Sequence, residues 1–164
     1  MTRSIFVANR LREVLLNGHW IANTNYKEQL LRITWKQAIQ KIGTLNTIAA
    51  LTFHVNYYLA GLLNVLHGGK LEIRDQYSFD LLPIQSEREW KELVDDFLSN
   101  AEKFAAQVEQ ITDSRFDEPF ADEKYGNYLR NIEGVIEHSY YHLGQISLIR
   151  KMIAENTEAQ AENK

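Results

Sequence analysis

Apolar side chains recur every three or four residues along most of this chain, and proline is nearly absent from those stretches. The 164 residues include only two prolines, Pro83 and Pro119, and both lie between the apolar stretches. An apolar residue on each helical turn produces an amphipathic helix, and a proline-free run allows that helix to continue. No segment alternates apolar and polar residues as a half-buried strand would. The sequence therefore predicts an all-α fold.

Four long helices are expected, with start and stop signals at their ends. The first, second and fourth helices cover about residues 4–16, 47–67 and 127–154, and the third begins at residue 86. Asn46 or Thr47 can cap the second helix, and Ser86 forms an S-x-x-E capping box with Glu89. A short additional helix is predicted over residues 35–42. Four amphipathic helices of this length suit a four-helix bundle with long connections.

The connection over residues 68–85 is much longer than a tight helical turn requires. A connection of this length can cross the bundle, so that the helices before and after it run parallel. The chain length suits one domain, which we assign to residues 1–155, followed by a polar, frayed tail over residues 156–164.

Composition narrows the class of protein. The net charge of −4 gives no basic footprint for nucleic acid, so no nucleic-acid partner is expected. The apolar residues near the N-terminus are interrupted by charges, and no long uncharged apolar run indicates a membrane span; a cytoplasmic protein is expected. The chain has no cysteine, so metal ligands must be His, Asp or Glu, and a thiol could arrive only with a co-substrate.

Two histidines, His138 and His142, lie four residues apart in the fourth helix. This spacing places both rings on one helix face, with Cβ atoms roughly 5–6 Å apart. His54 lies near the inward face of the second helix, where a lone histidine is often a hydrogen-bonded core residue. If the two helices face each other, three imidazoles meet and leave a fourth tetrahedral position open for water or substrate.

The two remaining histidines are expected outside such a site. His67 falls in the last turn of its helix, where it can meet free carbonyls, and His19 lies in a connection beside Trp20. Solvated surface positions are also expected for four arginines that could otherwise receive an anionic substrate: Arg12, Arg32, Arg74 and Arg130.

Several segments resemble the DinB/YfiT-like superfamily. The run from His138 to Ile146, HSYYHLGQI, is similar to the closing motif H-x-x-Y-H-x-G-Q-I of that family. The run from Asn46 to His54 resembles its second-helix motif, and Gly18-His-Trp resembles its tryptophan-containing loop. The resemblance covers nearly the whole chain in order and spacing.

The resemblance implies a four-helix bundle whose metal ligands are His54, His138 and His142, with zinc or nickel as the usual ion. Some relatives are thiol-dependent transferases or isomerases that use bacillithiol, mycothiol or glutathione, and many form dimers. The expected partners are therefore a small-molecule substrate, a low-molecular-weight thiol and a second copy of the chain. Gln145 matches the motif too, as a packing residue or as a hydrogen-bond partner of a ligand.

Three functions follow from a three-histidine metal site. The first is an S-transferase, in which the ion lowers the pKa of a small thiol that then attacks an electrophile. The second is a hydrolase, in which the ion activates water; it needs a general base, and neither Glu133 nor Glu137 faces the histidine pair. The third is a metal- or ligand-binding module without turnover, as in a stress response. A protein without metal, whose histidines are buried polar groups, is the remaining alternative.

Overall fold

The structure is a computed structural model that describes residues 1–162, with side chains described as far as residue 156. Its α-helices are α1 (Arg3–Arg12), α2 (Tyr26–Leu30), α3 (Trp35–Ala38), α4 (Ile48–Leu66), α5 (Glu87–Glu109) and α6 (Tyr128–Glu162). A π-helical turn, Glu13–Asn17, continues α1, and 3₁₀ turns lie at Asp75–Tyr77, Asp113–Asp117 and Glu123–Tyr125. Within the described residues, β-pairing is limited to one isolated bridge between Pro119 and Asn127. The predicted all-α fold is confirmed.

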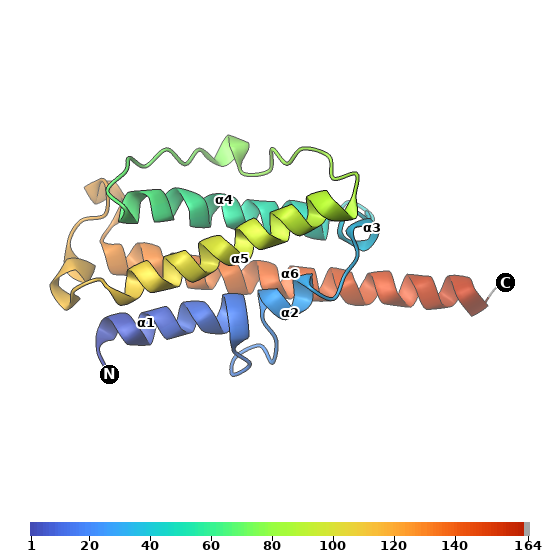
Figure 1. Cartoon of the computed structure of the whole chain (residues 1–164), viewed down its shortest axis with the longest axis horizontal. Coiled ribbons are helices and arrows are strands. Elements are labelled where there is room, and N and C mark those ends of the chain that lie inside the picture. The colour runs from blue at the N-terminus through green and yellow to red at the C-terminus, as the bar shows by residue number, and fades with distance from the viewer. Residues whose placement is uncertain (163–164) are drawn as a thin grey trace.

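The four long helices α1, α4, α5 and α6 pack side by side as a bundle (Figure 1). α1 and α6 run in one direction, and α4 and α5 run in the other. The long connection between α4 and α5 passes back along the bundle, so these two helices are parallel, as its length predicts. α6 extends beyond the end of the bundle.

The helix starts follow the capping residues. Thr47 is the N-cap of α4 and accepts a hydrogen bond from the Ala50 N–H, while Ser86 is the N-cap of α5 and accepts from the Glu89 N–H. The Glu89 carboxylate accepts from the N–H of Gln85, one residue before the cap. These contacts satisfy backbone donors that have no partner inside the helix, and they fix where α4 and α5 begin.

Three elements differ from the sequence-based expectation. α2 was not predicted, because five residues are too few to show helical periodicity, although Asn25 caps it through the Glu28 N–H. α3 ends at Ala38, earlier than predicted. α6 continues to Glu162, because the segment EAQAE is rich in helix-forming residues and contains neither glycine nor proline. The predicted tail is thus helical as far as residue 162, and residues 163–164 lie outside the described part.

The core fills the centre of the bundle with fully buried side chains from all four long helices. They include Leu11, Leu51, Phe97, Phe104 and Ile146. α4 is long and apolar enough to cross a membrane by length and composition alone, with a mean hydropathy of 1.2 over its best 18-residue window. Half of that window is buried inside the bundle, and a core helix passes the same test.

The connection between α4 and α5 is held along α4. The Tyr57 hydroxyl donates to the Arg74 carbonyl at 3.1 Å, and the Tyr58 hydroxyl donates to the Asp75 carboxylate at 2.9 Å. Ile73 packs against Gly61, where a Cβ atom would stand only 2.4 Å from Ile73 Cγ1. The connection therefore forms a cover over this part of α4, and we call residues 71–79 the strap.

Candidate metal centre

Three imidazole rings meet between α4 and α6. His54 comes from α4, and His138 and His142 come from successive turns of α6. His138 Nε2 lies 3.1 Å from His54 Nε2 and 2.9 Å from His142 Nε2. One ring nitrogen from each of the three residues lies within 4.8 Å of the others, an arrangement that could hold a metal ion. The predicted juxtaposition of the trio is therefore present.

Helix packing fixes the depth of the site. Leu51 of α4 and Ile146 of α6, each about one helical turn from a histidine of the trio, are buried in the core. His54 and His142 are each only 7% exposed, whereas His138 is half-buried. The four-residue spacing on α6 then places its two rings over one another along the helix.

Hydrogen bonds to the second ring nitrogens fix the tautomers of two histidines. His54 Nδ1 lies 3.3 Å from the Ser78 carbonyl oxygen, and His142 Nδ1 lies 2.7 Å from Gln145 Oε1. Both partners accept, so each Nδ1 carries the hydrogen and donates it. Each Nε2 is then left with a lone pair directed at the shared point, which is the form that binds a metal.

Burial keeps the three rings neutral. It lowers the pKa of His138 to about 4, with His142 and His54 adding to the effect. It also lowers the pKa of His54, together with the nearby His142, and it lowers the pKa of His142. Neutral imidazole is the ligand form, so at pH 7 the trio is already deprotonated for metal binding.

The donor set fits a divalent transition-metal ion. Two imidazole nitrogens, each about 2.0–2.1 Å from one tetrahedral ion, stand roughly 3.3 Å apart. The Nε2 separations of 2.9 and 3.1 Å are close to that value, and all three ligand nitrogens lie within 4.8 Å of one another. Three neutral imidazoles suit zinc, nickel, copper and iron.

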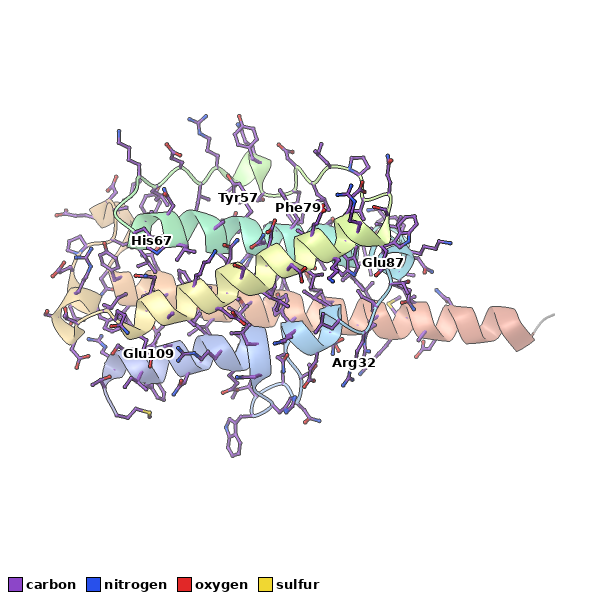
Figure 2. All side chains as sticks on the ribbon, viewed as in Figure 1. Arg32, Tyr57, His67, Phe79, Glu87 and Glu109 are labelled. Carbon is purple, nitrogen blue, oxygen red and sulfur yellow. The ribbon has the colours of Figure 1, made fainter. Side chains whose placement is uncertain are left out.

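Aromatic rings of α4 and the strap enclose the trio. Phe79 stacks on His54 with ring centroids 4.1 Å apart and 14° between the planes. Tyr58 contacts His54 and His138 edge-on, at centroid distances of 5.1 and 5.2 Å. Figure 2 shows Phe79 on the connection alongside α4. These rings therefore pack against the imidazoles on the strap side.

A cavity of about 610 Å³ opens beside the trio, with His138 in its wall. Its lining combines apolar side chains with a few polar ones, which is typical of a small-molecule site. The residues of the wall are Tyr58, Leu62, Leu71, Ile73, Asp75, Phe120, Tyr125, Arg130, Asn131, Gly134, Val135 and His138. A molecule in this cavity can therefore contact His138, the member of the trio that lies in the wall.

The other two histidines lie outside the trio. His19 is in the connection after α1 and pairs with Glu28, and His67 is the C-cap residue of α4. Figure 2 shows His67 at the end of α4, away from Phe79. Both positions agree with the sequence-based interpretation.

Neither glutamate considered as a general base lies in the cavity wall. Glu133 pairs with Arg10 at 3.6 Å, and Glu137 pairs with Arg130 at 2.9 Å. Tyr141 is 64% exposed, with its ring edge-on to His142 at a centroid distance of 4.8 Å, so it lies at the surface.

A profile of the DinB superfamily matches residues 23–146, about three-quarters of the chain. The match includes all three histidines of the trio. The chain belongs to the DinB superfamily. Comparisons with curated proteins and with solved structures gave no match. Membership of the DinB superfamily agrees with the all-α bundle and with a three-histidine group placed to hold a metal ion.

Sequence reasoning missed the partners that the strap brings to the trio. Ser78, Phe79 and Asp75 lie in a segment without periodicity, and nothing in their spacing indicates which part of α4 they cover. Arg130 is a solvated surface charge as predicted, with its side chain 61% exposed, and it also lines the cavity. Gln145 was expected either to pack or to form a hydrogen bond with a ligand, and the structure shows the hydrogen bond to His142. Residues three apart in a helix lie on the same face, so this spacing favours the contact.

Proposed function

We propose that this DinB-superfamily protein is a divalent-metal-dependent S-transferase that joins a small thiol to an electrophile. The observation that carries the proposal is the convergence of three neutral imidazole nitrogens at the edge of a 610 Å³ cavity. Three protein ligands leave one tetrahedral position for an exogenous group, as in reactive zinc sites. Because the chain has no cysteine, the nucleophilic sulfur comes from a co-substrate.

The residues of the chain perform three tasks in this function. His54, His138 and His142 hold the ion, which would be zinc or nickel. Ser78 and Gln145 keep two of the rings in the ligand tautomer. The strap and the cavity wall hold the reactants together and reduce the competing access of water.

Once bound, the ion would supply Lewis acidity that lowers the pKa of a thiol, so that sulfur reacts as thiolate at neutral pH. In the transfer, the sulfur electron pair forms a carbon–sulfur bond to the electrophile. The leaving group departs with its bonding electrons, and the thiol proton passes to solvent. The products are a thioether, the leaving-group anion and a proton released to solvent.

The test compares metal-loaded wild-type protein with a His142→Ala variant. Each is stripped with chelator, reloaded with zinc or nickel, and assayed with 1-chloro-2,4-dinitrobenzene and a panel of glutathione, cysteine, coenzyme A, bacillithiol and mycothiol. We expect metal-dependent thioether formation with at least one thiol. The variant should lose activity by at least about 100-fold, because removing a metal ligand lowers activity at least as much as removing a residue that hydrogen-bonds to a ligand.

His19→Ala is the matched control, because His19 is an exposed histidine outside the trio. It should retain wild-type turnover. Absence of turnover with every thiol and electrophile, in a protein that holds its metal, would rule out the transferase.

Hydrolysis is the second candidate, and one observation favours it. Asp75, a residue of the strap, places a carboxylate in the cavity wall that also contains His138. Such a carboxylate could accept a proton from water, the role for which Glu133 and Glu137 are badly placed. Loss of ester or amide hydrolysis in Asp75→Asn, without any thiol present, would favour this alternative over transfer.

A further inference from the structure

One side of the cavity is a single face of α6. Arg130, Gly134 and His138 follow each other at four-residue intervals, and all three line the cavity. Residues at this spacing lie above one another on a helix. A small molecule that approaches His138 along this face therefore meets Gly134 and the Arg130 side chain.

The orientation of the Arg130 side chain is set by a partner further along α6. Arg130 Nη1 donates to Glu137 Oε2 at 2.9 Å, so the side chain runs along α6 towards His138. It passes Gly134, where a Cβ atom would stand 4.0 Å from Nη1. Gly134 lies one helical turn from His138, a rise of about 6 Å.

The guanidinium has donors left for a ligand. The contact with Glu137 uses Nη1, while an arginine side chain has five N–H donors in a planar fork. Both partners of this pair are 61% exposed, so the fold depends little on it. The remaining edge of the fork matches the two oxygens of a carboxylate.

The opposite wall disfavours an anion. Asp75 is negatively charged, and the Tyr58 hydroxyl already donates to it. On α6 itself, the Asn131 amide is already used, because it donates to the backbone carbonyls of Tyr125 and Asn127. Among the described residues of the cavity wall, Arg130 is the one cationic side chain. An acidic group in the cavity is therefore directed to the α6 side.

We propose that Arg130 is the anion-binding residue of this cavity, and that the thiol co-substrate carries a carboxylate a few ångströms from its sulfur. Gly134 leaves the helix face between Arg130 and His138 without a side chain. The inference rests on the proposed S-transferase, and it narrows the thiol to the class of mercaptocarboxylic acids and their larger derivatives.

The test uses protein loaded with Co²⁺ and two thiols that differ only in charge, 3-mercaptopropionate and its methyl ester. Calorimetric titration gives the affinity for each, and the sulfur-to-cobalt charge-transfer absorption reports whether the sulfur binds the ion. We expect wild-type protein to bind the acid at least about tenfold more tightly than the ester, as for a charge-assisted hydrogen bond.

Two variants and one control locate the effect. Arg130→Gln should bind acid and ester equally, and Gly134→Leu should weaken binding of the acid by displacing the guanidinium, while both retain cobalt. Arg88→Gln removes another exposed arginine that pairs with a glutamate, Glu92, and should keep the wild-type preference.

The two possible failures are distinguishable. Equal affinity of wild-type protein for acid and ester, or an unchanged preference in Arg130→Gln, would overturn the role of Arg130. Absence of the charge-transfer band with both thiols would instead overturn metal-assisted thiol chemistry. In that case the calorimetric affinities for acid and ester would still show whether Arg130 binds a carboxylate.

Discussion

At the scale of single residues, the trio is organised by what its non-ligating nitrogens contact. The Ser78 carbonyl and the Gln145 amide oxygen each accept from a histidine Nδ1, so His54 and His142 direct lone pairs at one point. His138 completes the group from the same helix as His142. Two chemically identical side chains, His19 and His67, lack this arrangement, which shows that residue type alone does not identify a ligand.

The metal-free protein should become less stable as the pH falls from about 6.5 towards 4. Burial lowers the pKa of His138 to about 4 in the folded chain, against about 6.5 when unfolded. Between these values the unfolded chain binds more protons, so acid favours unfolding, and the stability present above pH 6.5 is lost as the pH falls. Urea unfolding at pH 7, 6 and 5 in the presence of EDTA measures the free energy of unfolding of the metal-free protein at each pH.

His138→Gln provides the comparison, because glutamine does not titrate. Its free energy of unfolding should fall less than that of the wild-type protein over the same pH range, whatever its value at pH 7. Equal slopes for the two proteins would show that protonation of His138 is not linked to unfolding.

At the scale of elements, the strap turns two helices into an enclosed site. It supplies the Ser78 carbonyl to His54, stacks Phe79 on the same ring, and brings Asp75 to the cavity wall. Its position on α4 depends on Gly61, since a Cβ atom there would stand 2.4 Å from Ile73 Cγ1. We therefore expect the strap, and not only the helices, to control access to the trio.

Gly61→Ala should displace Ile73 and loosen the strap. Overpacking of this kind typically costs about 1–3 kcal/mol, against a gain of roughly 0.5–1 kcal/mol when alanine replaces glycine in a helix. Gly144→Ala is the matched control, because Gly144 lies in α6 with nothing within 4 Å of its Cβ position. Thermal unfolding should show Gly144→Ala to be more stable than wild type and Gly61→Ala to be less stable.

Faster hydrogen exchange over residues 71–79 in Gly61→Ala should accompany that loss. Equal stabilisation by both substitutions would mean that the strap does not depend on the contact between Gly61 and Ile73.

At the scale of the whole molecule, the periodicity of apolar residues was sufficient to predict the bundle. The apolar stripes and the caps at Thr47 and Ser86 predicted α4 and α5, and the length of the connection predicted their parallel arrangement. The juxtaposition of His54 with the pair on α6 followed from two inward faces. The strap contacts and the cavity could not be predicted, because they depend on irregular backbone, which has no repeating pattern.

If three histidines hold one divalent ion, the metal content of the protein must depend on each of them. Elemental analysis of untagged protein, loaded with zinc or nickel and desalted, should give about one ion per chain for wild type and for His19→Ala. It should give almost none for His54→Ala, His138→Ala or His142→Ala. Full metal content in any of these three variants, or a wild-type protein that retains no ion, would contradict the account.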